Sequence, residues 1–167
     1  MSTTTEPTPT TVAPGQRHTV TVEKLTHGGS GLAHVDGLPV FIANTIPGQE
    51  VEITVTKRKD NFAEARLDKV VRKAKEETMP RCSHFHECGG CSWQNLPYDK
   101  QLSYKEEIVR ETLGHLTPAP PEVRATLPGR VTKIQPSPQV YHYRNKLEMS
   151  FGYGKMRVEE KAGRRIY

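Results

Sequence analysis

The sequence is poor in the residues that build a large core or a disulfide framework. Its 167 residues include three cysteines and one tryptophan, and hydrophobic residues make up 34% of the chain. An odd cysteine count, without a basic segment and apolar block near the amino terminus, argues against a secreted, disulfide-bonded protein. No apolar run approaches the length that spans a bilayer, so we expect no membrane protein. These absences favour a reducing, cytoplasmic setting.

Proline and glycine, by contrast, are frequent, with 13 residues of each. This composition predicts small modules joined by loops rather than one large core. The first segment is rich in Thr and Pro and has little to bury, so we expect it to be disordered. The predicted organisation is a disordered tail at 1–16, a small barrel at 17–75, a cysteine loop at 76–97, a helix at 98–116, and a linker with the start of a central β domain at 117–167.

The segment 17–75 has the pattern of a β domain. Apolar and polar residues alternate with a period of two, which is typical of half-buried strands. Asp36-Gly37 between two apolar runs predicts a two-residue hairpin. Strands are expected at 19–25, 32–35, 38–42, 51–56 and 62–70. Five short strands predict a small closed barrel of the oligonucleotide-binding type, so the fold class is all-β with additional α/β elements.

Basic residues are concentrated in two segments. Residues 57–81 contain nine basic and five acidic residues, and residues 144–167 contain seven basic and three acidic ones, against a net charge of +5. Such clusters favour a surface for a polyanion, although a solvated charged face is the alternative. The candidate contacts on the barrel are Lys57, Arg58, Lys59, Arg66, Arg72 and Lys73. His27, Phe41 and Phe62 could stack on bases, but a core position is favoured for the two phenylalanines.

All three cysteines lie within ten residues. Five residues separate Cys82 from Cys88, and two separate Cys88 from Cys91. The second gap is typical of zinc and iron–sulfur loops, and Gly89 and Gly90 allow the backbone to bend between the sulfurs. A zinc site with a histidine as fourth ligand and a [4Fe–4S] cluster both fit this spacing, and unliganded thiols are a third alternative. The candidate histidines are His84, His86 and His115.

A helix is predicted from Tyr98, because Pro97 favours the first turn and Asp99 suits its positive dipole end. Gly114 is a natural stop signal. The residues expected on the packed face are Tyr98, Leu102, Lys105, Val109, Thr112 and Leu116, with Ile108 and Leu113 beside them. Those expected on the solvent face are Glu106, Glu107, Arg110 and Glu111.

Two motifs resemble known families. Cys82-x5-Cys88-Gly89-Gly90-Cys91, followed by Trp93-Gln94 and Tyr98-x2-Gln101-Leu102-x2-Lys105, resembles the RNA uracil-5-methyltransferase family. The segments 27–33, 39–42 and 46–51 resemble the TRAM domain, an RNA-binding barrel found at the front of that family. The resemblance implies an S-adenosylmethionine-dependent enzyme that methylates C5 of uridine. It also implies a [4Fe–4S] cluster held by Cys82, Cys88, Cys91 and a fourth cysteine, which would fall beyond Tyr167.

The resemblance extends to Tyr143-Arg144-Asn145-Lys146, which in the family begins a central β domain, and it makes Arg144 and Lys146 candidate RNA contacts. No glycine-rich adenosylmethionine motif occurs in the 167 residues, so we expect this chain alone to be inactive. The expected partner is RNA, with ribosomal RNA favoured over transfer RNA, and the expected state is a monomer. The alternative is a free-standing RNA-binding module stabilised by zinc. A radical adenosylmethionine enzyme is disfavoured by the cysteine gaps.

Overall fold

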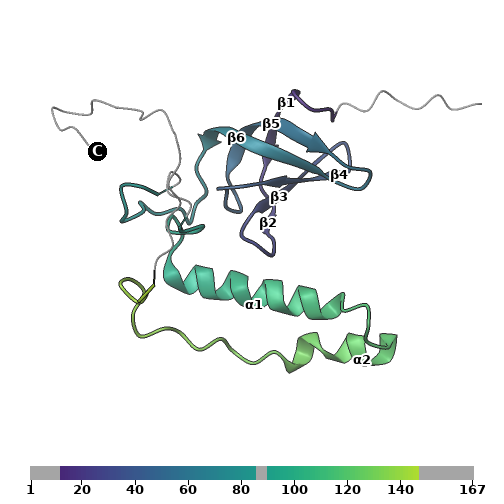
Figure 1. The fold of residues 1–167 in the computed structure, drawn as a ribbon, viewed down its shortest axis with the longest axis vertical. Coiled ribbons are helices and arrows are strands. Elements are labelled where there is room, and N and C mark those ends of the chain that lie inside the picture. Colours follow the sequence, from purple (N-terminus) through teal and green to yellow (C-terminus); the bar gives the residue numbers. More distant parts are fainter. Residues whose placement is uncertain (1–11, 86–89, 147–167) are drawn as a thin grey trace, which may run out of the picture. The chain divides into compact units, whose positions relative to one another are not determined.

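A computed structural model gives the placement of residues 12–85 and 90–146 (Figure 1). The chain divides into two compact units, Met1–Pro136 and Ser137–Tyr167, which are described separately. The strands of the described residues are β1 (Arg17–Thr21), β2 (Lys24–Leu25), β3 (Gly31–Val35), β4 (Leu38–Ile42), β5 (Glu50–Arg58) and β6 (Ala63–Arg72). The helices are α1 (Tyr98–Gly114), α2 (Pro121–Thr126) and the 3-10 turn η1 (Pro128–Arg130).

The six strands form one mixed sheet in the order β1-β5-β6-β4-β3-β2. Strands β4 and β6 are parallel, and the other neighbouring pairs are antiparallel. The prediction of five strands in a closed barrel was therefore wrong, because this sheet has six strands and an open order. The physical reason is a bend at Val22 and Glu23, which divides the expected first strand into β1 and β2.

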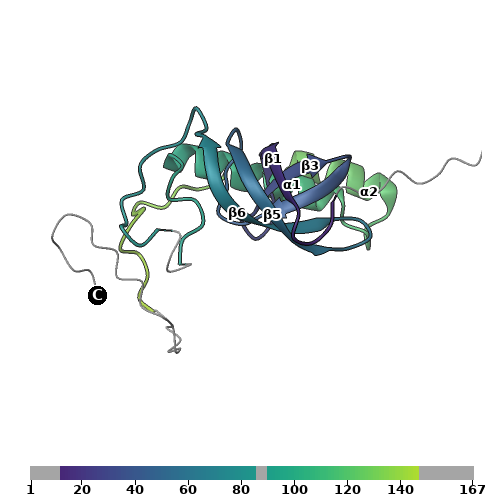
Figure 2. The ribbon, with the colours of Figure 1, turned by 90° about the horizontal axis from the view of Figure 1, so that it is seen from above.

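The bend brings one stretch of chain to both edges of the sheet. The amide of Val22 donates to the carbonyl of Gln49 at 2.8 Å, on the side of β5, and the amide of Glu23 donates to the carbonyl of Leu32 in β3, also at 2.8 Å. The sheet therefore curls, as Figure 2 shows. Register shifts between β5 and β6 add to the curl, because a bulge increases the local twist.

The main hydrophobic core lies inside the curled sheet. Its fully buried side chains come from alternating positions of the strands, as in Val51, Ile53 and Val55 on β5. Val12 belongs to the same core and is 2% exposed, and the amide of Gly15 donates to the carbonyl of Val55 at 2.8 Å. Residues 12–16, which were placed in the tail from their sequence, thus contact the main core and β5. Residues 1–11 lie outside the described part of the chain.

The hairpin prediction at Asp36-Gly37 is confirmed. These two residues have φ angles of 49° and 79°, and Val35 pairs with Leu38 across the turn. Both central residues thus occupy the left-handed region, which matches the right-handed twist of the flanking strands. This two-residue turn fixes the register in which β3 pairs with β4.

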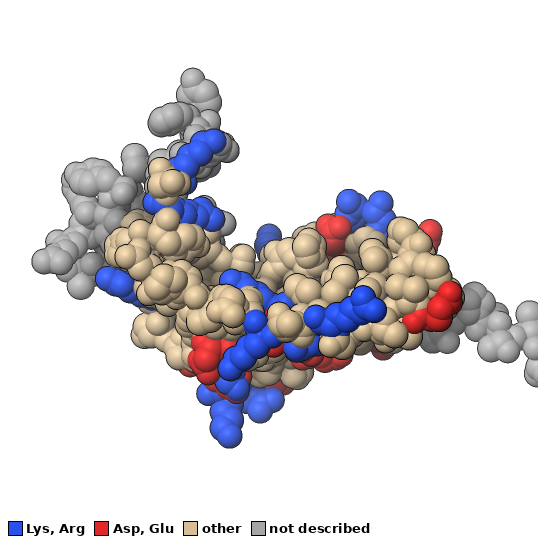
Figure 3. Space-filling model, turned by 90° about the horizontal axis from the view of Figure 1, so that it is seen from below, with Lys and Arg blue, Asp and Glu red and all other residues tan. Residues whose placement is uncertain are grey.

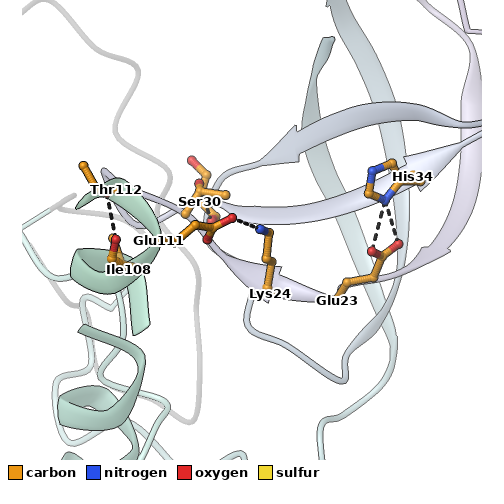
Figure 4. A network of polar contacts seen from close by, with 8 residues as sticks. Glu23, Lys24, Ser30, His34, Ile108, Glu111 and Thr112 are labelled. Carbon is orange, nitrogen blue, oxygen red and sulfur yellow. Dashed lines mark hydrogen bonds and ion pairs between the residues drawn. The ribbon is translucent and has the colours of Figure 1, made fainter. Parts of the chain in front are cut away.

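A second, smaller core joins the sheet to helix α1. Leu25, Ile46, Ala74 and Leu96 are buried in it, and Trp93, Tyr104 and Ile108 pack against them. At the same junction Lys24 of β2 forms an ion pair with Glu111 of α1 (Figure 4). The stretch from β1 to β2 therefore contributes to both cores, because Val20 and Val22 lie in the main core and Leu25 lies in the second core.

The face of α1 that packs differs from the one expected. Tyr104 and Ile108 contact the second core, whereas Lys105, Thr112 and Val109 are exposed. The expected solvent residue Glu106 accepts from the amide of Ile134 at 2.7 Å, and Arg110 donates to the carbonyl of Val131 at 3.2 Å. The polar face of α1 is thus used to hold the connector 131–134. Residues 131–134 themselves form no helix or strand.

Candidate nucleic-acid interface and cysteine loop

The candidate RNA-binding cations of the curled sheet lie on its two longest strands, β5 and β6, and at the hairpin tip between them. Lys57 and Arg58 end β5, and Lys59 follows in the turn, where its amide donates to the carbonyl of Phe62 at 2.8 Å. Arg66 and Arg72 lie on β6, and Lys73 comes directly after it. All six side chains are exposed or half-buried. The structure therefore brings them onto one hairpin.

Carboxylates neutralise part of this set. Across the hairpin Lys57 lies opposite Glu64, and Arg72 lies opposite Glu50 with an ion pair at 3.2 Å. Arg66 pairs with Asp68 at 3.0 Å. Figure 3 shows acidic atoms close to basic ones on the face seen there. Four of the six predicted cations have no ion pair within the part of the chain that the structure describes: Lys57, Arg58, Lys59 and Lys73.

The carboxyl of Asp68 is itself held in its charged form. The hydroxyl of Thr54 donates to it, and with Arg66 it keeps the pKa of Asp68 below its ordinary value, although partial desolvation acts in the opposite direction. Because the carboxylate of Asp68 stays charged, its ion pair with Arg66 is retained. The paired arginines of this hairpin are thus Arg66 and Arg72, whereas Lys57, Arg58 and Lys59 at its tip form no ion pair with a carboxylate among the described residues.

The hairpin tip also carries an aromatic pair and a recess. Phe41 and Phe62 lie edge to face with ring centroids 5.5 Å apart, and both are half-buried. They are not members of the buried cores, so the expectation of core positions holds only in part. A recess of about 300 Å³ lies beside Arg58 and Lys59, and one acidic residue also lines it. Its lining residues are Val12, Ala13, Pro14, Arg58, Lys59 and Asp60.

Two of the three cysteines can be placed. Cys82 is half-buried, Cys91 is exposed, and neither forms a disulfide. The amide N–H of Cys82 donates to Oε1 of Gln94 at 2.9 Å, and Nε2 of Gln94 donates to Sγ of Cys91 at 3.4 Å. One side chain thus bridges the two cysteines. An N–H donor directed at the sulfur of a free cysteine is an arrangement that also occurs around thiolate-bound metals.

Cys88 lies outside the described residues, together with His86. Within the described residues no group of three or more His, Cys, Asp or Glu side chains could hold a metal ion. The three-cysteine ligand set therefore stays a prediction from the sequence. Of the other candidate ligands, His84 is exposed next to Ser83, and His115 follows the end of α1.

The cysteine loop is joined to the glycine-rich loop of the sheet and to α1. Nε1 of Trp93 donates to the carbonyl of Gly29 at 3.0 Å. Nε2 of Gln101 donates to the carbonyls of Trp93 and Leu96, both at 2.9 Å. In the sequence, Trp93, Gln94 and Gln101 were recognised only as marks of resemblance. Their roles in holding the loop were missed, because neither composition nor periodicity indicates which distant carbonyl a side-chain N–H will bond.

The remaining candidates, Arg144 and Lys146, belong to the second compact unit. Both are exposed, and the described residues 141–146 of this unit form bends and contain no strand. The central β domain expected to begin here shows no strand up to residue 146, and residues 147–167 lie outside the described part of the chain. Across the described ranges, no helix has the length and apolar content needed to cross a membrane.

Residues 12–67, which include most of the curled sheet, match the TRAM domain family. An RNA methyltransferase of Nitratidesulfovibrio vulgaris, whose name calls it uncharacterised, is 39% identical over 142 residues, covering 84% of this chain and 29% of that relative. The 23S rRNA (uracil(1939)-C(5))-methyltransferase RlmD of Vibrio vulnificus is 43% identical over 94 residues, covering 56% of this chain and 22% of RlmD. The chain is therefore similar to RNA methyltransferases, one of which is named for methylation of uracil C5 in 23S rRNA.

The similarity is to the amino-terminal portion of these relatives. The chain spans less than a third of the length of these relatives. An RNA methyltransferase of Listeria innocua, also called uncharacterised, is 37% identical over 134 residues, with 80% of this chain and 28% of that protein covered. Among solved structures, a conserved protein of Methanococcus maripaludis is 36% identical, covers 35% of this chain and 83% of its own, and has a TM-score of 0.34.

Proposed function

We propose that this chain is the RNA-binding and [4Fe–4S]-binding part of an S-adenosylmethionine-dependent RNA (uracil-5-)-methyltransferase that acts on ribosomal RNA. The observation that carries the RNA-binding role is the match of residues 12–67 to the TRAM domain, on a curled sheet with uncompensated cations near one hairpin. The similarity to an enzyme named for 23S rRNA supports ribosomal RNA as the substrate.

The RNA contact is proposed at the tip and end of the β5–β6 hairpin. Arg58, Lys59 and Lys73 are free to neutralise phosphates and release counterions, since no carboxylate is paired with them in the described part of the chain. Arg66 and Arg72 must first give up Asp68 and Glu50, so their net contribution is smaller. The half-buried pair Phe41 and Phe62 offers ring surface for an unpaired base close to that tip.

A salt titration tests this surface. Binding of a fluorescent 23S ribosomal RNA fragment is measured by anisotropy for the parent chain and for Arg58→Glu, Lys59→Glu and Arg66→Ala. The first two variants should bind more weakly, and the slope of log affinity against log salt should fall by about 1 for each phosphate that is no longer neutralised. Arg66→Ala should change binding less. Lys105→Glu, on the exposed part of α1, is the matched control for added negative charge.

The outcomes separate clearly. Equal decreases in affinity in Arg58→Glu and Lys105→Glu would mean that the RNA responds to net charge alone, and the hairpin interface would be refuted. A larger decrease in Arg66→Ala than in Lys59→Glu would place the RNA along the strands rather than at their ends. Arg144 and Lys146 are proposed as contacts outside the barrel, and each is tested by the same titration after substitution with Glu.

The metal centre is proposed at Cys82, Cys88 and Cys91. The side chain of Gln94 bonds the backbone N–H of Cys82 and the sulfur of Cys91, and neither of these two cysteines forms a disulfide. When bound, the cluster would stabilise the loop through iron–thiolate bonds, and methyl transfer itself needs no electron from it. The residues around it then set the position of the loop, with Trp93 bonded to Gly29 and Gln101 bonded to the loop carbonyls.

Anaerobic isolation followed by metal analysis tests this part. Iron and acid-labile sulfide with broad visible absorbance are expected, and Cys88→Ser should abolish both. Colourless protein with stoichiometric zinc would instead support the zinc-stabilised RNA-binding module. Methyl transfer is proposed for the full enzyme, so this chain with labelled S-adenosylmethionine and ribosomal RNA should transfer no label. Steady transfer by these 167 residues would refute that expectation.

A further inference from the structure

Gln94 makes two different hydrogen bonds with its side-chain amide, and each reaches a cysteine. Its Oε1 accepts from the backbone N–H of Cys82 at 2.9 Å, and its Nε2 donates to Sγ of Cys91 at 3.4 Å. The orientation of the amide follows from chemistry, because a backbone N–H can only donate and must face the carbonyl oxygen. The NH₂ group is then directed at the sulfur.

The backbone around Gln94 is fixed on both sides. Trp93 before it donates from its ring to the carbonyl of Gly29 at 3.0 Å, and its own carbonyl accepts from Gln101. Asn95 after it is 3% exposed, and its carbonyl accepts from the amide of Thr78 at 2.8 Å. A side chain on a backbone held at both neighbours has few positions available to it. The direction of the Gln94 side chain is therefore set by the hydrogen bonds that hold Trp93 and Asn95 on either side of it.

We propose that Gln94 is a positioning residue for the metal centre, which fixes Cys82 relative to Cys91 and donates an N–H to the Cys91 sulfur. The inference rests on the proposed function, since it takes the centre to be the iron–sulfur cluster. A donor to a ligating sulfur withdraws electron density from it, so it slows loss of the metal and raises the reduction potential. The acceptor bond to Cys82 has a separate effect, because it orders the first ligand before metal arrives.

Two substitutions separate these effects. Gln94→Glu keeps an oxygen that can accept from Cys82 but removes the donor to Cys91. Gln94→Leu removes both hydrogen bonds at similar side-chain size. Gln135→Glu and Gln135→Leu are the matched controls, because Gln135 is exposed and lies outside the cysteine loop. All variants are made in the protein encoded by the full open reading frame that contains this chain.

Three readouts are compared: hydrogen exchange of the Cys82 amide in the metal-free protein, loss of visible absorbance in the presence of a chelator, and the reduction potential. In Gln94→Glu the Cys82 amide should stay protected, while cluster loss accelerates about tenfold and the potential falls. In Gln94→Leu the amide should also exchange faster. The Gln135 variants should match the parent protein in all three measurements.

The outcomes distinguish this inference from the proposed function. If the parent protein binds iron and the Gln94 variants lose it no faster than the Gln135 variants, the positioning role is overturned while the cluster stands. If Gln94→Leu accelerates cluster loss but Gln94→Glu does not, the donor to Cys91 is overturned. If the parent protein holds no iron, both the proposed cluster and the role of Gln94 toward it are overturned.

Discussion

The contact between the glycine-rich loop and the cysteine loop can be tested at two adjacent glycines. Gly28 and Gly29 both have positive φ angles, +88° and +91°, so an alanine at either position adopts a backbone conformation that L-residues avoid. That strain costs about 1–2 kcal/mol at each site. The surroundings differ, since a Cβ on Gly28 would meet nothing within 4 Å. Gly28→Ala is thus a control for strain alone.

At Gly29 the added Cβ would lie 3.1 Å from Cβ and Oγ of Ser92 and 3.5 Å from Nε1 of Trp93. The cysteine loop must then shift by a few tenths of an ångström, and the hydrogen bond from Trp93 to the carbonyl of Gly29 is disturbed. Crowding of this kind costs at least about 1 kcal/mol. We therefore expect Gly29→Ala to be less stable than Gly28→Ala by about 1 kcal/mol.

Urea unfolding of the two variants measures this difference, and the emission of Trp93 reports its cause. Trp93 is the single tryptophan of the chain, so its fluorescence arises at the contact itself. A shifted emission in Gly29→Ala, with parent-like emission in Gly28→Ala, is the expected result. Equal stabilities together with unchanged emission in both variants would show that the two loops do not touch, and the reasoning would be refuted.

Three further predictions concern the cores and their charges. Ile53→Ala in the main core should lower the free energy of unfolding by about 2–5 kcal/mol, against less than about 0.5 kcal/mol for exposed Glu52→Ala; equal decreases would contradict the burial. Burial raises the pKa of Tyr104, so its stabilising contribution is present below the ordinary value of 10.0 and lost as pH rises through the raised one. Urea midpoints should therefore fall in strong alkali, and this fall should be smaller in Tyr104→Phe. A double-mutant cycle on Lys24 and Glu111 should give a coupling of about 0.2–1 kcal/mol that salt reduces; a coupling insensitive to salt would argue against an exposed ion pair.

Local signals in the sequence predicted the local structure well. Asp36-Gly37 specified its hairpin because both residues tolerate positive φ, and Pro97 with Asp99 marked the start of α1. The bend at Val22 and Glu23 was missed because both residues are compatible with a strand. The alternation of apolar residues does change at this point, because Val20 and Val22 are two positions apart, whereas Leu25 comes three positions after Val22. That change is what directs Leu25 into the second core.

Contacts between distant segments were not predictable from the same signals. Val12 follows a Thr- and Pro-rich stretch, and its burial depends on a core that the later strands complete. Glu106 and Arg110 are charged, so periodicity placed them in solvent, whereas they hold a connector more than twenty residues away. At the candidate interface, composition identified the cations but could not show which are paired. The pairing of Arg72 with Glu50 follows from the register of β5 and β6, whereas Arg66 pairs with Asp68 two residues along its own strand.

The bend between β1 and β2 has a consequence for the edges of the sheet. Both edges of the sheet are formed by one short amino-terminal stretch, with five residues at one side and two at the other. Short outer strands offer little unpaired backbone to a neighbouring molecule. Shortening the chain past Thr21 would uncover the edge of β5 from Glu50 to Thr54, on a strand with an apolar inner face. A truncated protein would expose a template for intermolecular strand pairing, and aggregation would then precede any loss of RNA affinity.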